Sequence, residues 1–346
     1  MMSPRRLTSS FVSILVALGC AAAPAAAQRI ELAWPTPNTA FRDGKPIEAY
    51  VQPTVSGLVT SGLFGCVRSD GTQFHEGLDL YPIARDRAGE ATDKIFAVLP
   101  GVVRYINLRV GDSSYGRYLV LEHPEYTPAI YTLYAHLAAV APGLKEGDRV
   151  ASGQAIATMG RSAGGYSIPK ERAHLHFEFG IRLTNAFQPW YEFKKFGSPN
   201  KHGLWNGMNL MGFDPLDFFE RFRAREVNNF QEYFARMKPA VRVRVVSRVV
   251  PDYVERYPSL LTAPVPAEGV AGWEVAFNET GLPMAWTPLG AADVTGLRAG
   301  WPQVVEVDEE RVRAGRCRSL VTRRRTGYIP GSDLENVLQM LFGWRR

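Results

Sequence analysis

The stretch His174-Leu175-His176-Phe177-Glu178-Phe179 alternates polar and apolar residues without a break. Successive side chains of a β-strand point to opposite faces of a sheet. As a strand, this stretch turns two imidazoles and one carboxylate to one face and three apolar side chains to the other. The pattern therefore predicts a strand that buries one face in a core and presents two histidines together on the other face.

Short apolar runs interrupted by glycine surround this stretch, from about Gly62 to Ile181. Turn signals such as Pro100-Gly101 and Gly147-Asp148 separate the runs, and no segment here shows an apolar period of 3.6 residues. The clearest runs are residues 95–99, 102–106, 118–122 and 130–134. We therefore expect a mainly β protein whose first domain is an antiparallel sheet or sandwich.

Four of the six histidines lie in patterns that suit metal or proton chemistry. His75-Glu76-Gly77-Leu78-Asp79 places an imidazole and a carboxylate four residues apart, and both groups are zinc ligands in proteins. His136 follows the apolar strand that ends in Tyr134-Ala135, where a sheet delivers side chains to a cleft. A core histidine bonded to the backbone remains an alternative for His136. The combination of H-x-x-x-D with H-x-H favours a metal site.

Together these motifs resemble those of the lysostaphin-type zinc endopeptidases. The pattern of that family combines H-x-G-x-D, Y-x-H-L, G-Q-x-I and a final H-L-H-F-E. This chain carries all four in the same order across roughly residues 70–180, the third as Gly153-Gln154-Ala155-Ile156. The resemblance implies that the catalytic domain is an antiparallel β-sandwich of the duplicated hybrid motif type.

The resemblance also implies roles for five residues. It assigns His75, Asp79 and His176 as the ligands of one Zn²⁺ per chain. It assigns His136 and His174 as the two unliganded catalytic histidines, which act on water and substrate. Three protein ligands leave the fourth zinc position to a water molecule, whose pKa the metal lowers to about 7. Which of the two histidines is the general base stays open.

Glu178 lies on the same face of the expected strand as His174 and His176. It could act as the general base, or it could orient an imidazole from outside the ligand set. We favour the second role or a structural one.

The resemblance implies a zinc-dependent endopeptidase that hydrolyses peptide bonds in the stems or cross-links of peptidoglycan. Which bond is cut stays open. The alternative is a zinc-binding but non-catalytic scaffold of the cell wall, or an activator of another wall hydrolase. The complete set of five residues argues against that alternative.

Residues 1–27 have the pattern of a secretory signal peptide. Arg5 and Arg6 precede an apolar run at 11–19, and three alanines at 25–27 precede Gln28. The run is far shorter than the roughly 20 residues that span a bilayer, so we expect no transmembrane span. The product would be exported, as a periplasmic or secreted protein. Lipid attachment at Cys20 is the less favoured alternative.

The rest of the chain divides into further segments. We expect an N-terminal arm at 28–60, a zinc metallopeptidase domain at 61–215, a helix at 216–238 and a β-rich C-terminal domain of unknown role at 239–346. The aromatic-rich segment 182–213 is expected to be a loop because glycine, proline and asparagine are frequent in it. Cys66 and Cys317 either form a disulfide between the first and last of these domains or remain two free thiols.

The composition agrees with two globular domains. The chain has 346 residues, of which 46% are hydrophobic and 21% charged. Its formal net charge of +6 is modest for this length, so we expect no nucleic-acid partner. The sequence does not indicate an oligomeric state.

Overall fold

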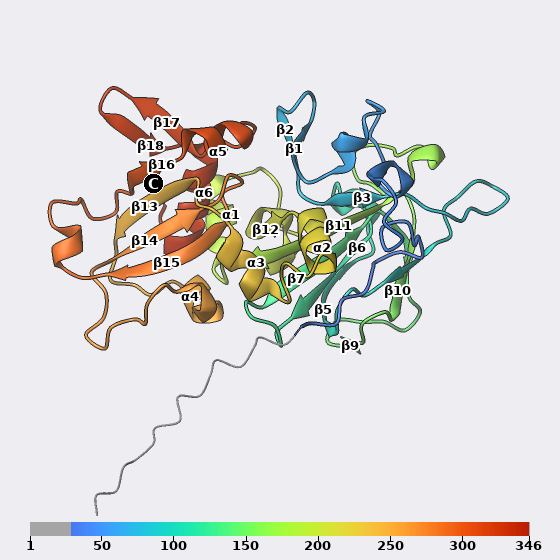
Figure 1. Cartoon of the computed structure of the whole chain (residues 1–346), viewed down its shortest axis with the longest axis horizontal. Helices are drawn as coiled ribbons and strands as arrows, with labels where there is room; N and C mark the ends of the chain where they lie inside the picture. The colour runs from blue at the N-terminus through green and yellow to red at the C-terminus, as the bar shows by residue number, and fades with distance from the viewer. Residues whose placement is uncertain (1–28, 346) are drawn as a thin grey trace, which may run out of the picture.

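The structure, a computed structural model, describes residues 29–345 (Figure 1). The predicted signal peptide at 1–27 and the alternative lipid site at Cys20 lie outside this range. Among residues 29–345, no helix combines the length and the apolar character that crossing a bilayer requires.

A large antiparallel sheet forms the centre of the molecule (Figure 1). Its strands follow the order β12-β11-β7-β6-β5-β9, and β3 pairs with β11 beside β12. The bounds are β3 Leu78–Leu80, β5 Gly101–Asn107, β6 Tyr118–His123, β7 Ile130–Ala135, β9 Arg149–Val150, β11 Leu175–Arg182 and β12 Leu210–Phe213. The strand predicted from 174–179 is therefore an inner strand of this sheet.

Strand β11 separates the core from the polar side of the sheet. Its residues Leu175, Phe177 and Phe179 are fully buried in the main hydrophobic core, as the alternation predicts. The first half of β11 pairs with β3 and the second half with β12. In this register Asp79 lies directly opposite His176.

A smaller sheet packs on the same side as the main core. It consists of β4 (Lys94–Phe96), β10 (Ala155–Met159) and β8 (Leu137–Val140) in that order. Ile95 and Ile156 from this sheet belong to the same hydrophobic cluster as Phe177 of the large one. The expectation of a mainly β, antiparallel sandwich is confirmed.

The segment 182–213 is not a plain loop, so this expectation was wrong. It contains helix α1 (Phe187–Lys194) and the edge strand β12, joined by two short 3₁₀ turns. Trp190 and Phe187 are buried on one side of α1, and their burial stabilises the helix despite the glycines and prolines that follow. Only part of the expected aromatic loop is irregular.

The prediction of a single helix at 216–238 was also wrong, because the structure has two helices there. They are α2 (Pro215–Arg223) and α3 (Phe230–Arg236). Arg225 adopts a left-handed conformation with φ 60°, which ends the first helix, and Asn229 caps the second by accepting a hydrogen bond from Glu232 N. The rings of Phe218 and Phe230 then stack with their centroids 4.5 Å apart.

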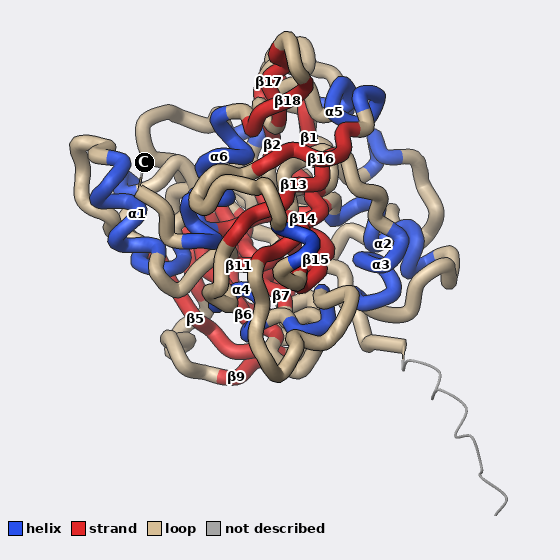
Figure 2. Tube along the Cα trace, turned by 90° about the vertical axis from the view of Figure 1, so that its left-hand side faces the viewer, coloured by secondary structure: helices blue, strands red, loops and turns tan. Residues whose placement is uncertain are grey.

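The C-terminal region is β-rich, and Figure 2 views the molecule from its side. Its sheet has the order β15-β14-β13-β16, and β17 and β18 form a hairpin beside it. The bounds are β13 Val241–Val246, β14 Gly272–Phe277, β15 Pro283–Leu289, β16 Gln303–Val307, β17 Val321–Arg324, β18 Gly327–Pro330, α4 Asp252–Arg256, α5 Glu309–Ala314 and α6 Ser332–Phe342. The β character expected for this region is confirmed.

The N-terminal arm folds against helix α2 and the end of strand β3. Trp34 and Phe41 stack with their ring centroids 4.4 Å apart and contact Phe219 of α2. Val51 forms a β-bridge with Leu80 at the end of β3. The arm therefore reaches the strand that carries Asp79.

Candidate metal centre

Two adjacent strands and one hairpin bring the predicted ligands together. Asp79 is in β3 and His176 is in β11, and the two strands are paired at these residues. His75 ends β2 (Gln73–His75), which forms a hairpin with β1 (Gly65–Arg68). The structure therefore gathers residues that lie about one hundred positions apart in the sequence.

Gly77 allows this close approach. A Cβ atom at this position would lie 2.4 Å from Phe177 O and 3.0 Å from the imidazole ring of His176. Contacts below 3.0 Å to backbone atoms require the neighbouring strand to shift. The glycine of the H-x-G-x-D motif is therefore needed so that β3 and β11 can pair beside the ligands.

The ligand atoms form a small triangle. His75 Nε2 lies 3.0 Å from His176 Nδ1, and Asp79 Oδ1 lies 3.1 Å from each of these nitrogens. Zinc binds nitrogen and carboxylate ligands at about 2.0–2.2 Å, so tetrahedral ligand atoms lie about 3.3 Å apart. The observed separations are close to this spacing, and these three residues can hold one metal ion.

The imidazoles of His75 and His176 each have a hydrogen-bond partner on the side away from the triangle. These partners determine which ring nitrogen faces the other ligands. His75 Nδ1 lies 2.7 Å from Leu63 O, and His176 Nε2 lies 3.0 Å from Glu178 Oε1. We assign the ring proton to each of these outward nitrogens, because a carbonyl and a carboxylate accept hydrogen bonds. The inward nitrogens would then be unprotonated when a metal is bound, as metal ligands must be.

His136 and His174, the two remaining histidines of the motifs, also have one ring nitrogen next to a backbone carbonyl. His136 Nδ1 lies 2.8 Å from Ser162 O, and His174 Nδ1 lies 2.7 Å from Arg172 O. Each Nδ1–H donates to a backbone carbonyl, which leaves each Nε2 free to accept a proton. The rings contact each other with centroids 4.8 Å apart, and His136 has an unusual positive φ of 59°.

The charges of the site favour a bound cation. Burial would raise the pKa of Asp79, but the surrounding imidazoles of His75, His174 and His176 outweigh it and hold that pKa well below its usual value. Burial would lower the pKa of His176, yet hydrogen bonds to Asp79 and Glu178 raise it to about 9. The centre of the triangle therefore attracts positive charge strongly.

The pKa values of the two unliganded histidines move in the opposite direction. Burial is the main cause of the lowered pKa of His136, and the imidazoles of His174 and His176 lower it further. Burial also lowers the pKa of His174, although the carboxylate of Asp79 opposes the effect. Both side chains are therefore neutral near pH 7 and can accept a proton.

Glu178 lies behind the ligands and points away from the open side of the site. Besides His176, its carboxylate accepts hydrogen bonds from Tyr115 Oη at 2.6 Å and Tyr131 Oη at 2.9 Å. It is almost completely buried. This geometry agrees with a residue that orients an imidazole and leaves no route for Glu178 to reach a substrate.

A groove of about 720 Å³ opens beside the ligands. His136 and His176 line its base, and Tyr166 lies at its rim. Val55 and Leu58 from the N-terminal arm line another part of it and are exposed.

Sequence reasoning missed Arg68. Its Nη2 lies 2.6 Å from Asp79 Oδ2, the carboxylate oxygen that is not part of the ligand triangle. The dipeptide Asp70-Gly71 is a hairpin signal, and it would have indicated that residues 65–75 form a hairpin ending at His75. It could not have revealed the contact with Asp79.

The other two histidines lie outside the site, as expected. His123 is buried and bonded to Pro100 O and Thr132 Oγ1. His202 contacts Tyr105 Oη and Asp112 O. Both are locally hydrogen-bonded structural residues.

Two imidazoles and one carboxylate form a group that could hold one metal ion, and this donor set also occurs in zinc hydrolases. Residues 73–189, about a third of the chain, match the model described as Peptidase family M23. The chain therefore contains a domain of peptidase family M23, the lysostaphin-type family. The resemblance seen in the sequence is confirmed for this domain.

Solved structures also resemble parts of the chain. A zinc-containing peptidase from Vibrio cholerae is 28% identical, with 38% of this chain and 34% of that chain covered and a TM-score of 0.27. The catalytic domain of lysostaphin from Staphylococcus simulans is 17% identical, with 50% and 95% covered and a TM-score of 0.27. A catalytic-domain mutant of the prophage-encoded M23 protein EnpA from Enterococcus faecalis is 21% identical, with 38% and 79% covered and a TM-score of 0.27.

The match covers only about a third of the Vibrio protein. With TM-scores below 0.5, none of these likenesses supports a further conclusion. The search of curated proteins gave no match.

Proposed function

We propose that this protein is a zinc-dependent endopeptidase that hydrolyses peptide bonds in peptidoglycan. The observation that carries the proposal is the convergence of His75 Nε2, His176 Nδ1 and Asp79 Oδ1 at 3.0–3.1 Å, beside a groove. The M23 domain supports the peptidase class. The peptidoglycan substrate is inferred from the family resemblance.

In this proposal His75, Asp79 and His176 hold one Zn²⁺. When bound, the metal polarises a peptide carbonyl and makes water acidic enough to react near neutral pH. His136 and His174 are neutral and present free Nε2 atoms, so either can accept the proton of the attacking water. The other can donate a hydrogen bond to the oxygen that develops negative charge if it takes up a proton at Nε2 from solvent before the reaction.

We further propose that the protein is exported. The signal-peptide pattern of residues 1–27 is one support. The other is the disulfide between Cys66 and Cys317, because disulfides form and persist in oxidising compartments. A periplasmic or secreted enzyme would meet peptidoglycan directly.

The test compares the mature protein with its His174→Ala variant. Zinc content is measured by mass spectrometry, and release of soluble fragments is measured on purified peptidoglycan. We expect one zinc per chain in both proteins, and fragment release only by the wild type. Zinc binding without fragment release from any wall preparation would favour the non-catalytic scaffold or activator. Absence of zinc from the wild type would refute the proposal.

A further inference from the structure

The side chain of Arg68 contacts the carboxylate of Asp79 from outside the ligand triangle. Its Nη2 lies 2.6 Å from Asp79 Oδ2, and its Nε donates to Ser61 O at 3.3 Å. Asp79 is buried, whereas the Arg68 side chain is 27% exposed and lines the groove. The guanidinium therefore connects the groove wall to a predicted metal ligand.

The two oxygens of Asp79 have different partners. Oδ1 lies 3.1 Å from the ligand nitrogens of His75 and His176, while Oδ2 contacts Arg68. A carboxylate can bind a metal through one oxygen or through both. A charge-assisted hydrogen bond on Oδ2 restrains rotation of the carboxylate and leaves Oδ1 as the metal ligand.

Arg68 belongs to the β1–β2 hairpin, which lies between the catalytic sheet and the C-terminal domain (Figure 1). Within residues 29–345 this hairpin forms a two-stranded sheet of its own. Isolated two-stranded hairpins are only marginally stable in water. Its position must therefore depend on contacts other than strand pairing.

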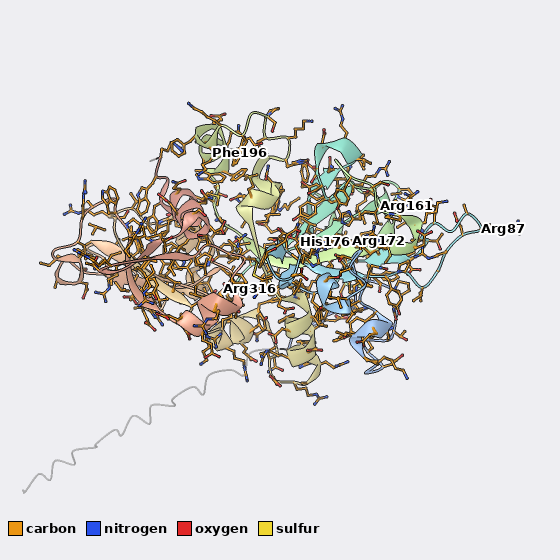
Figure 3. The ribbon with its side chains drawn as sticks, turned by 90° about the horizontal axis from the view of Figure 1, so that it is seen from above. Arg87, Arg161, Arg172, His176, Phe196 and Arg316 are labelled. Atoms are coloured by element: carbon orange, nitrogen blue, oxygen red, sulfur yellow. A yellow bond between two sulfur atoms is a disulfide. The ribbon has the colours of Figure 1, made fainter. Side chains whose placement is uncertain are left out.

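The C-terminal domain supplies several such contacts. Cys66 in β1 forms a disulfide with Cys317. Arg316 donates to Asp70 O at 2.7 Å and to Gly71 O at 3.3 Å, at the tip of the hairpin. Figure 3 shows Arg316 on the side of the C-terminal domain that faces His176. These contacts fix both the strand and the turn of the hairpin.

A third contact involves an aromatic ring of the hairpin. The guanidinium of Arg318 lies 4.9 Å from the centroid of the Phe74 ring. Phe74 directly precedes His75, the ligand that ends the hairpin. The C-terminal domain thus holds the hairpin at its tip and at the end that carries His75, where Cys66 pairs with Phe74.

We propose that Arg68 is a positioning residue for Asp79, and that the C-terminal domain is a brace that holds Arg68 in place through the β1–β2 hairpin. This inference rests on the proposed zinc peptidase function and gives residues 239–346 a role in it. The brace acts on the metal site without contributing a ligand.

The first test replaces Arg68 by Met, which keeps an unbranched apolar stem and removes the charged guanidinium. Zinc affinity is measured by competition with a coloured chelator, and the visible spectrum of the Co²⁺-loaded protein reports the coordination geometry. Arg68→Met should weaken zinc binding about 10- to 100-fold and alter the Co²⁺ spectrum. Arg68→Lys, which keeps one charged donor, should lie between this variant and the wild type.

Arg87→Met is the matched control, because Arg87 is exposed at the tip of a projecting loop far from His176 (Figure 3). It should leave both readouts unchanged. Unchanged zinc affinity and an unchanged Co²⁺ spectrum in Arg68→Met would overturn the inference. An equal loss of zinc affinity in Arg68→Met and Arg87→Met would also overturn it. A wild type that binds no zinc would instead overturn the proposed function.

The second test removes the disulfide of the brace with Cys66→Ser and Cys317→Ser together, in the wild type and in Arg68→Met. The double serine variant should weaken zinc binding severalfold in the wild type and have little further effect when Arg68 is already absent. A loss of thermal stability with unchanged zinc affinity would refute the brace. Equal losses of zinc affinity in the wild type and in Arg68→Met would also refute it. The disulfide would then act on the metal site through His75 and not through Arg68.

Discussion

Asp79 and His176 are directly opposite each other on the paired antiparallel strands β3 and β11. This register places Asp79 Oδ1 3.1 Å from His176 Nδ1, and His75 completes the triangle from the neighbouring hairpin. The geometry of the metal centre is therefore fixed by backbone hydrogen bonds between two strands. Changes that shift this register should impair metal binding even when all ligands are present.

Gly77→Ala should produce such a shift. The added Cβ would lie 2.4 Å from Phe177 O, so β3 must move away from β11. We expect at least tenfold weaker zinc binding and a loss of stability of about 1–3 kcal/mol, as in other overpacked sites. Chelator competition and thermal unfolding measure the two effects.

Gly111→Ala provides the control for this substitution. No heavy atom beyond its chain neighbours lies within 4 Å of a Cβ built there. It should leave zinc affinity unchanged. If Gly77→Ala also binds zinc as tightly as the wild type, the close approach of the two strands is not required.

Glu178→Ala should weaken metal binding, because it removes the hydrogen-bond partner of a ligand. The carboxylate accepts a hydrogen bond from His176 Nε2, which keeps Nδ1 free for the metal. Losing such an outer partner costs roughly 10- to 100-fold in metal affinity. Zinc titration of the variant measures this loss.

Tyr131→Phe tests whether the loss of zinc affinity in Glu178→Ala comes from the lost contact with the His176 imidazole. It removes another hydrogen bond of Glu178 but leaves His176 untouched. We expect zinc affinity within a few-fold of the wild type. Equal losses for Tyr131→Phe and Glu178→Ala would mean that the buried network as a whole, and not the orientation of His176, determines the affinity.

His123 should make the fold sensitive to acid. Burial lowers the pKa of its imidazole to about 4, below the ordinary 6.5. As the pH falls below 6.5 the unfolded chain takes up this proton first, so the stabilisation is complete above pH 6.5 and is lost towards pH 4. The loss is on the order of 3 kcal/mol at 1.36 kcal/mol per pKa unit.

The measurement is chemical denaturation of metal-free protein at pH 7 and at pH 4.5. His123→Gln cannot take up this proton, so its stability should change less between the two conditions than that of the wild type. An identical change in both proteins would show that His123 is not the source of the acid sensitivity.

The sequence predicts the parts of this protein that depend on local patterns. The alternation around Phe177 shows which side chains of β11 face the core, because the side-chain period of a strand is two residues. The spacing within each motif is also local, and the resemblance to the lysostaphin-type family then selects the five motif residues. The structure brings all five together, while their roles remain predictions.

Features that depend on distant contacts were not predicted. The contact between Arg68 and Asp79 needs the position of a whole hairpin. The disulfide joins cysteines 251 residues apart, and the sequence left it as one of two alternatives. The break between α2 and α3 depends on Arg225 and the cap at Asn229, which interrupt an otherwise helical apolar spacing. Apolar periodicity alone does not reveal such a break between two helices.

The central claim is that this protein hydrolyses peptide bonds with a zinc ion. The most direct measurement is the appearance of new free amino groups in purified peptidoglycan, because each hydrolysed peptide bond releases one. We predict that zinc-loaded protein produces them, that a chelator abolishes the activity and that added zinc restores it. No new amino groups, or release that continues unchanged after the zinc is removed, would contradict the account.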